Sequence, residues 1–293
     1  MPNCTLALEA NAELGECPRW HVAERKLYWV DIARCELHRF DPATGRDEAR
    51  HFAAPVGCFA FLPDGGFLLG MKQGFARLES WEGEPHPFGE PIFADKPDLR
   101  MNDGRTDAQG RFWAGSVNMA KSARDAALYR LDGDGSITCV EGGMLTCNGA
   151  AFDASGRHFC HTDTPSHALR LYDVDGAAGE ISHGAILHRF PMGEGRPDGG
   201  SFDAEGHYWS ALFDGGRVVR LSPAGEIVQT VALPVSRPTM IAFGGVDLRT
   251  AYVTTARTGL SPEQREQQPL AGGIFSFPVD VPGLPEHPFR PSA

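Results

Sequence analysis

The sequence is poor in lysine and contains no cluster of basic residues. Only four of its 293 residues are lysines, and the formal net charge is -11. Because nucleic-acid binding depends largely on basic residues that neutralise phosphates, we expect no nucleic-acid partner. No stretch approaches the roughly 18 apolar residues of a membrane span. The first residues, MPNCTLALEANAEL, lack the basic start and apolar core of a secretion signal. The sequence therefore predicts a cytoplasmic protein with no membrane partner.

Several chemical signatures are also missing. The seven cysteines are scattered and include no CxxC pair. In a chain without a secretion signal, this pattern predicts reduced thiols and argues against a zinc or redox cysteine site. No G-x-S-x-G, P-loop or G-x-G-x-x-G segment occurs. Serine acyl transfer, nucleotide triphosphate chemistry and dinucleotide binding therefore have no support.

The sequence does contain a unit that is repeated six times. The six turn positions are His21, Asp64, Asp107, Asp153, Asp203 and Asp247. The four inner copies share a turn with an acidic residue, a glycine and an aromatic residue, and the first and last copies are degenerate, as is expected of terminal repeats. Successive positions are 43 to 50 residues apart. Asp and Gly at these places are typical of tight turns between strands, because Asp bonds its own backbone and Gly accepts a positive φ.

A segment of alternating apolar and polar residues follows each turn. These segments are LHRFD (37–41), FARLE (75–79), LYRLD (128–132), LRLYD (169–173), VVRLS (218–222) and IFSFP (274–278). A period of about 40 to 50 residues built from short strands is typical of a four-stranded propeller blade. We therefore predict a single domain over residues 1–293, an all-β, six-bladed β-propeller with antiparallel blades around a central channel. A two-sheet sandwich is the alternative, but it does not account for a sixfold period.

Three further segments have predicted roles in this fold. The N-terminal strand TLALEA (5–10) is expected to pair with the last blade and close the ring. The long segments at 116–127 and 256–273 are expected to be lids, because loops of this length are often functional.

Four polar residues occupy the same place in the repeat. Glu16, Asn102, Asn148 and Asp198 each stand five residues before a turn position. Since the first strand of each blade lines the channel, these side chains should converge at one depth. Two carboxylates and two amide carbonyls form an oxygen site suited to Ca²⁺, Mg²⁺ or Mn²⁺. Alternatively, Glu16, Asn148 and Asp198 are turn residues, since Pro or Gly stands nearby in each case.

Other polar residues are candidates for contacts near this point. Arg100 and Asp103 flank Asn102, and together the three supply donors and acceptors that could hold a polyhydroxylated substrate. Arg100 could instead form an ion pair with Asp98 or Asp103. His161 is either a base near the channel rim or, as we favour, a buried core histidine.

Longer motifs resemble the SMP-30/gluconolactonase family. They are GECPRW (15–20), RMNDGRTDAQGRFWAGSV (100–117), CNG (147–149), RPDGGSFDAEGHYWSAL (196–212), GGRVVRLSPAGEIVQTVALP (215–234) and ARTGLSP…PLAGGIF (256–275). The similarity extends from about residue 13 to residue 278. It implies a six-bladed propeller that binds one divalent cation in its channel and hydrolyses sugar-acid lactones.

The resemblance also implies roles for individual residues. Glu16, Asn148 and Asp198 would be the metal ligands. Arg100, Asn102 and Asp103 would contact the substrate, so that Asn102 changes from ligand to substrate contact. Vertebrate members place a Glu in the lid where this chain has Asn118 to Lys121, so their substrate preference cannot be transferred. The PLAGG loop looks more like that of bacterial pentonolactonases.

The resulting hypothesis is a divalent-metal-dependent lactonase, a carboxylic ester hydrolase. One cation (Ca, Mg, Mn, Zn or Fe) would act as Lewis acid on an aldono-1,4- or 1,5-lactone such as arabinono-, xylono- or gluconolactone. Asp198 or Asp103 would be the general base that activates water. The partner is then a small sugar lactone, and the protein a monomer or weak homo-oligomer. The alternatives are a metal-dependent propeller hydrolase of phosphotriesters or aryl esters, and a non-catalytic binding propeller.

Overall fold

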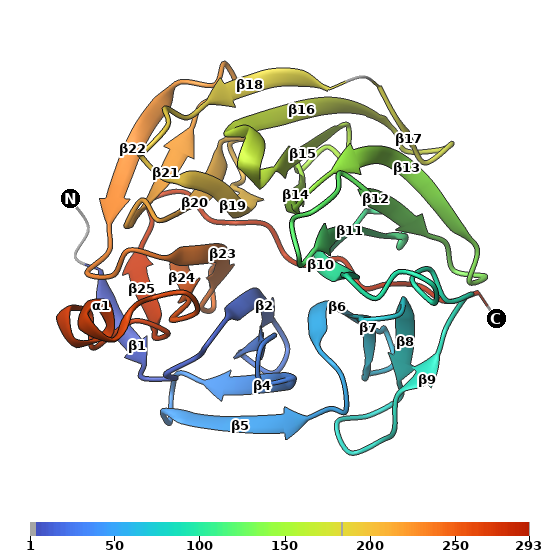
Figure 1. The fold of residues 1–293 in the computed structure, drawn as a ribbon, viewed down its shortest axis with the longest axis horizontal. Helices are drawn as coiled ribbons and strands as arrows, with labels where there is room; N and C mark the ends of the chain where they lie inside the picture. Colours follow the sequence, from blue (N-terminus) through green and yellow to red (C-terminus); the bar gives the residue numbers. More distant parts are fainter. Residues whose placement is uncertain (1–3, 183, 293) are drawn as a thin grey trace.

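The chain folds into a ring of six antiparallel sheets. The computed structural model describes residues 4–182 and 184–292, and nearly all of its regular structure is β-strand. The six sheets surround a central channel, with the first strand of each sheet innermost (Figure 1). The predicted six-bladed β-propeller is therefore confirmed.

Five blades contain four strands each, and the fourth blade contains five. The strands of a blade follow one another from the channel outwards. From the inside outwards, the first blade contains β2 (Gly15–His21), β3 (Lys26–Asp31), β4 (Glu36–Asp41) and β5 (Arg46–His51). The second blade contains β6 (Val56–Phe61), β7 (Phe67–Met71), β8 (Phe75–Leu78) and β9 (His86–Pro87). The third blade contains β10 (Leu99–Thr106), β11 (Phe112–Asn118), β12 (Ala126–Leu131) and β13 (Ile137–Met144). The next two are β14 (Cys147–Phe152), β15 (His158–Asp163), β16 (Ala168–Asp175) and β18 (Ala185–Arg189), with β17 (Glu180–Ile181) also pairing with β16; and β19 (Arg196–Phe202), β20 (Tyr208–Phe213), β21 (Arg217–Leu221) and β22 (Ile227–Ala232). The sixth blade is β23 (Pro238–Gly244), β24 (Thr250–Thr255), β25 (Ile274–Pro278) and β1 (Thr5–Leu8).

The sixth blade closes the ring by combining the two ends of the chain. Its outer strand, β1, pairs with β25, and Thr5 lies opposite Ser276. The predicted pairing of the N-terminal strand with the last blade is confirmed. In the closed ring, the inner strands of neighbouring blades pack against one another around the channel.

The repeated turn motif connects the first and second strands of a blade. The carboxylate of Asp107 accepts hydrogen bonds from the backbone N–H groups of Gln109 and Arg111, which confirms the predicted self-bonding turn. The same carboxylate accepts a bond from Nε1 of Trp113 at 2.9 Å. Asp203 and Trp209 repeat this contact at 3.0 Å in the fifth blade. The motif therefore fixes both the turn and a large buried ring between blades.

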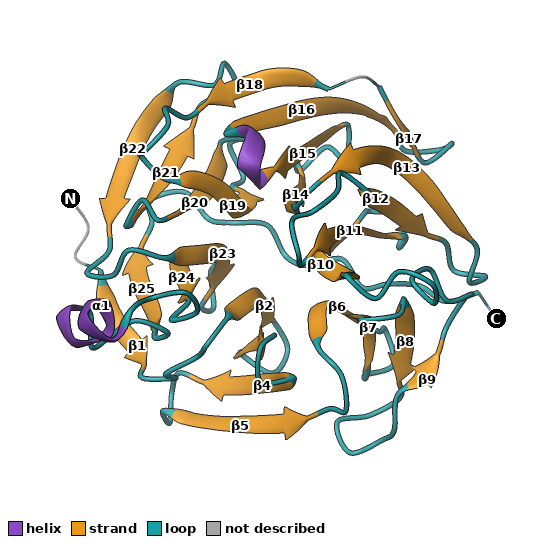
Figure 2. Cartoon of the chain, viewed as in Figure 1, coloured by secondary structure: helices purple, strands orange, loops and turns teal. Residues whose placement is uncertain are grey.

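The two long segments lie on the same face of the ring. Residues 119–125 connect β11 to β12, and residues 256–273 connect β24 to β25. Both join a second strand to a third strand, so both lie on the face where the inner strands begin. The second segment contains a short helix, α1 (Pro262–Gln267), and Figure 2 shows it in purple beside β1. Sequence analysis missed this helix, although Ser261 and Gln264 form a capping box that marks its start.

The C-terminal segment crosses the opposite face of the ring. Gly283 bridges to Asp203, and the backbone N–H of Phe289 donates to the carbonyl of Phe61 at 2.9 Å. Phe61 ends an inner strand, so this segment, residues 279–292, lies across the channel at the far end from the lids. We call it the C-terminal strap. Across residues 4–182 and 184–292, no helix is both long and apolar enough for a bilayer crossing.

Candidate metal and substrate site

The inner strands are irregular at the positions that sequence analysis selected. Pairing with the second strand shifts register between Glu16 and Arg19, Met101 and Gly104, Asn148 and Ala151, and Pro197 and Gly200. Such β-bulges redirect a side chain and are common beside active sites. Glu16, Asn148 and Asp198 therefore lie within strands, and their interpretation as residues of hairpin turns is wrong.

Two of the candidate ligands are buried carboxylates that have no Lys or Arg nitrogen within 4.0 Å among the described residues. Glu16 and Asp198 are 7% and 5% exposed. Burial raises the pKa of Glu16 to about 8, and the charge of Asp103 contributes to the rise. Burial, followed by the charge of Glu16, raises the pKa of Asp198 well above its ordinary value. The two carboxyl groups are thus close enough to repel each other.

Among the described residues, these two carboxylates have only one hydrogen-bond donor between them. Glu16 accepts one bond, from the backbone N–H of Cys17 at 3.3 Å. No donor or basic side chain within bonding distance of the Asp198 carboxylate is found among the described residues. A buried anion without a partner is costly, so a divalent cation between the two groups fits the site. In the described part of the chain, no three His, Cys, Asp or Glu side chains gather as a metal site. A cation here would therefore need amide oxygen as well.

A directed chain of hydrogen bonds supplies and orients that amide. Arg100 Nη1 donates to Asn102 Oδ1 at 2.8 Å, and Asn102 Nδ2 donates to Asn148 Oδ1 at 2.7 Å. Asn148 Nδ2 donates to Thr164 Oγ1, which in turn donates to the carbonyl of Pro197, both at 2.8 Å. A guanidinium can only donate and a carbonyl can only accept, so the direction of each amide is fixed at both ends.

This series of hydrogen bonds places the two asparagines in different surroundings. The Asn148 carbonyl has a second lone pair that remains available. The Asn102 carbonyl faces Arg100 instead, and its amide nitrogen also donates to the carbonyl of Cys147 at 2.9 Å. The arrangement therefore holds Asn102 as a bridge between Arg100 and Asn148.

Arg100 is buried at 8% exposure, yet it has no carboxylate partner. Among the described residues no Asp or Glu oxygen lies within 4.0 Å of its guanidinium, so the predicted alternative of an ion pair with Asp98 or Asp103 is wrong. Burial lowers the pKa of Arg100 to about 10, which leaves it charged at neutral pH. Only its Nη1 is engaged in hydrogen bonds, so other N–H groups are free to bind a ligand.

Asp103 is held differently from Asp198. Its Oδ1 accepts a bond from the backbone N–H of Gly104 at 2.7 Å, and its Oδ2 accepts one from Ala150 at 2.9 Å. Arg19 approaches Oδ1 at 3.9 Å. The carboxylate therefore ties two inner strands together beneath the candidate ligands.

Sequence analysis missed a buried ion cluster around Asp103. Arg19 and Arg105 both contact Glu286 of the C-terminal strap, with Arg19 Nε 3.6 Å from Glu286 Oε2. Arg105 Nη2 also donates to the carbonyl of Gly200 at 2.9 Å. Arg19 and Arg105 each stand two residues before a turn position of the repeat, and this shared offset could have revealed them.

The lid places one lysine at the site. Lys121 Nζ donates to Thr146 Oγ1, two residues before Asn148. Burial, followed by the charge of Arg100, lowers the pKa of Lys121 to about 8, and Asp198 acts in the opposite direction. Lys121 therefore lies close enough to interact electrostatically with both Arg100 and Asp198.

His161 does not share this environment. It is almost fully buried on β15 and stacks on Phe159 with ring centroids 5.9 Å apart. Burial lowers the pKa of His161 to about 4, so the ring is neutral at physiological pH. These observations favour the core-histidine interpretation.

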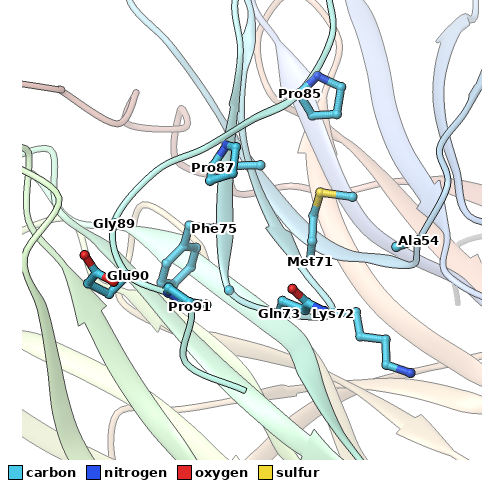
Figure 3. Close-up of a pocket in the computed structure, with 12 residues that line it drawn as sticks. Ala54, Met71, Lys72, Gln73, Phe75, Pro85, Pro87, Gly89, Glu90 and Pro91 are labelled. Carbon is cyan, nitrogen blue, oxygen red and sulfur yellow. The ribbon is translucent and has the colours of Figure 1, made fainter. Parts of the chain in front are cut away.

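A cavity of about 450 Å³ lies away from the site. It is in the second blade, where Met71, Phe75 and three prolines line it (Figure 3). None of the predicted site residues lines it. Its lining is mainly apolar and contains no pair of carboxylates, so the chemistry described above belongs to the channel.

Comparisons with known proteins agree with this architecture. Residues 14–257 match the model of the family described as SMP-30/Gluconolactonase/LRE-like region. The chain is 41% identical to a 6-deoxy-6-sulfogluconolactonase from Pseudomonas putida, over 93% of this chain and 94% of the relative. It is 34% identical to regucalcin from Gallus gallus, over 94% of each. Among solved structures, a calcium-binding protein, regucalcin from Agrobacterium tumefaciens, superposes with a TM-score of 0.93 at 25% identity, covering 97% of this chain and 96% of that one.

Proposed function

Because this chain belongs to the SMP-30/gluconolactonase family, we propose that it hydrolyses a sugar-acid lactone with the help of one divalent cation. The names of its relatives support the reaction class, since one is a sulfogluconolactonase. The calcium-binding neighbour supports a cation in the channel. Ca²⁺, Mg²⁺, Mn²⁺, Zn²⁺ and Fe²⁺ are all candidates for the ion.

One observation of the chain itself carries the proposal. Glu16 and Asp198 are two buried carboxylates close enough for the charge of Glu16 to raise the pKa of Asp198, and neither has a Lys or Arg nitrogen within 4.0 Å among the described residues. Asn148, at the same place in the repeat, is held by hydrogen bonds to Asn102 and Thr164. We assign these three residues as the ligands. Oxygen donors of this kind suit hard divalent cations. When bound, the cation would act as a Lewis acid toward the lactone carbonyl.

The remaining residues would bind and orient the substrate. The free N–H groups of Arg100 can hold sugar hydroxyls, and Asn102 fixes the guanidinium in place. Holding the lactone in one orientation lowers the entropic part of the barrier. Asp103 would contribute by keeping the two neighbouring strands in register, because both its oxygens are engaged by backbone N–H groups.

Asp198 is our candidate for the general base. Its carboxylate has no donor among the described residues, so an oxygen lone pair can accept a proton from the attacking water. The water oxygen adds to the carbonyl carbon, the ring C–O bond breaks, and the released alkoxide takes up a proton. The product is the open-chain aldonate.

The test is hydrolysis of a panel of pentono- and hexono-1,4- and 1,5-lactones. The protein is first treated with chelator, and single cations are then added back. We expect no turnover without cation, restored turnover with at least one, and a loss of at least about 100-fold in kcat/KM for Asp198→Asn. Full activity of that variant would refute its assignment. Rapid hydrolysis of a phosphotriester or aryl ester, with no lactone turned over, would refute the proposed function.

A further inference from the structure

Two basic side chains, Arg100 and Lys121, lie at the mouth of the channel, and the carboxylates whose charges act on them include the candidate ligands Glu16 and Asp198. Arg100 is buried beside the candidate ligands, and Lys121 reaches the site from the lid. Among the described residues, neither has an Asp or Glu oxygen within 4.0 Å. Two other cations that act on this region differ in this respect, since Arg124 pairs with Asp163 and Arg196 pairs with Asp214.

The charges of the proposed metal centre do not remove this excess. With Glu16 and Asp198 ionised, one divalent cation leaves that centre neutral. Arg100 and Lys121 then remain as an uncompensated pair at the place where the substrate enters. Uncompensated charge in a partly desolvated site is costly unless a ligand supplies the opposite sign.

From this arrangement we infer that the preferred lactone carries an anionic substituent, a sulfonate, phosphate or carboxylate, that is bound by Lys121 and Arg100. This inference rests on the proposed lactonase function and narrows its substrate class. Lysine and arginine can only donate hydrogen bonds. Neutral sugar hydroxyls need donors and acceptors together, whereas an anionic oxygen group needs donors alone. The two side chains Lys121 and Arg100 offer donors alone, and this pair therefore matches an anion.

The lid is held in place before any ligand arrives. Met119 N–H donates to the carbonyl of Asp98 at 2.8 Å, and Asn118 Nδ2 donates to Asp125 at 2.8 Å. Lys121 N–H donates to the carbonyl of Asn118 at 3.1 Å. The bond from Lys121 Nζ to Thr146 uses one of three ammonium donors. The two remaining N–H donors of the Lys121 ammonium are therefore in position without a closing movement of the lid.

Asp125 is the acidic side chain of the lid, and its Oδ1 accepts the bond from Asn118. The lid side chain on which the charges of Arg100 and Asp198 act is instead the cation Lys121. This is the same region in which the sequence departs from the vertebrate members of the family.

The test compares four lactones of one sugar. Glucono-1,5-lactone is measured beside its 6-phosphate, its 6-deoxy-6-sulfonate and its 6-carboxylate analogue, with the wild type and with Lys121→Gln. We expect the wild type to favour at least one anionic lactone by kcat/KM. In Lys121→Gln this preference should fall about tenfold or more, the change expected for one lost charge-assisted hydrogen bond.

The matched control is Lys96→Gln, which makes the same change at an exposed lysine on the connection leading into β10. Its preference should stay within about twofold of wild type. A second measurement uses calorimetry with gluconate and gluconate 6-phosphate on chelated protein, where the 6-phosphate should bind more tightly to wild type than to Lys121→Gln. This difference should shrink as salt screens the exposed ammonium.

The outcomes separate the inference from the proposed function. If wild type hydrolyses the neutral lactone as well as all three anionic ones, the inference fails and the lactonase function stands. Equal losses on neutral and anionic lactones in Lys121→Gln would mean that Lys121 serves the reacting carbonyl, and would also overturn the inference. If no lactone is hydrolysed with any cation, both proposals are wrong.

Discussion

At the scale of single residues, the direction of hydrogen bonds decides which groups can hold a cation. The hydrogen bonds from Arg100 through Asn102 to Asn148 fix which atom of the Asn148 amide is the oxygen, the atom that our proposal assigns to the cation. Thr164 is the last side chain in this series of hydrogen bonds. Its hydroxyl accepts a hydrogen bond from Asn148 and donates one to the carbonyl of Pro197, next to Asp198. It is therefore a positioning residue for both candidate ligands.

Replacing Thr164 with valine removes this hydroxyl while keeping the shape of the side chain. We expect Thr164→Val to weaken cation binding by about tenfold, as loss of a supporting hydrogen bond around a metal site typically does. Thr164→Ser keeps the hydroxyl and is the control. The affinity is measured by calorimetric titration of chelated protein. Identical affinities in the two variants would show that Thr164 does not position the ligands.

Stability of the chelated protein should depend on the ionisation of Glu16. Its folded pKa, about 8, is raised above the ordinary value of 4.5. The folded state therefore holds a proton that the unfolded state releases, and stability must fall as pH rises from about 4.5 to about 8. Urea unfolding at several pH values, in the presence of chelator, measures this slope.

Glu16→Gln provides the control for this effect. Its amide does not titrate, so its stability should vary less with pH over the same interval. Bound cation should also flatten the curve, because it favours the ionised ligands. A wild-type protein whose stability rises through this interval under chelation would contradict the assigned environment of Glu16.

At the scale of elements, the β-bulges of the inner strands explain how a regular sheet can present ligands. The bulge after Asn148 contains Gly149, whose φ of 70° is favourable only for glycine. A side chain there would also collide with its surroundings, since a Cβ would lie 2.7 Å from the Tyr208 hydroxyl. That hydroxyl donates to the Gly149 carbonyl at 2.8 Å. Local conformation and packing thus require the same residue.

Gly149→Ala should destabilise the protein by roughly 2 to 4 kcal/mol, because it combines an unfavourable φ with a steric clash. Gly206→Ala is the control, since Gly206 also has a positive φ, of 78°, but has open space around its Cα. It should cost only about 1 kcal/mol. Chemical denaturation of both variants gives the comparison. Equal costs would show that the contact with Tyr208 is unimportant.

At the scale of the whole molecule, two segments from the ends of the chain complete the ring. β1 supplies the outer strand of the sixth blade, and the C-terminal strap covers the channel opposite the lids. The strap also brings Glu286 to the buried Arg19 and Arg105. Burial acts against ionisation of Glu286, but the two guanidinium groups hold its pKa below the ordinary value.

Glu286→Gln would leave two buried guanidinium groups without this partner. We expect a loss of about 3 kcal/mol or more in the free energy of unfolding, as found when one member of a buried ion pair is removed. Glu205→Gln is the control, because Glu205 pairs with Arg220 while 60% exposed, and should change stability by less than about 1 kcal/mol. Equal effects would show that the strap does not depend on this cluster.

Much of the fold could be predicted from the sequence because the repeat is visible at the level of turns. The Asp and Gly of each turn act locally, so their spacing reports the blades directly. The sites of Glu16, Asn148 and Asp198 could be predicted for the same reason, since equal offsets give equal depth. The orientation of Asn102 could not, because it depends on Arg100 and Cys147 together with a bulge in the strand.

The ion cluster of Arg19, Arg105 and Glu286 could not be predicted from the sequence repeat either. Glu286 lies outside the repeated units and reaches Arg105 across 181 positions of the chain. Nothing local to residues 279–292 indicates which face of the ring they cover. Long-range contacts of this kind require coordinates, whereas a periodic sequence is sufficient for the blades.

The central claim is that residues from three blades hold one divalent cation, and crystals soaked in Mn²⁺ test it most directly. An anomalous difference map should show one strong peak in the channel, within about 2.5 Å of oxygens from Glu16, Asn148 and Asp198. The same experiment on Asp198→Asn should give a much weaker peak. A map with no channel peak at saturating Mn²⁺, or with its peak away from these three side chains, would contradict the account.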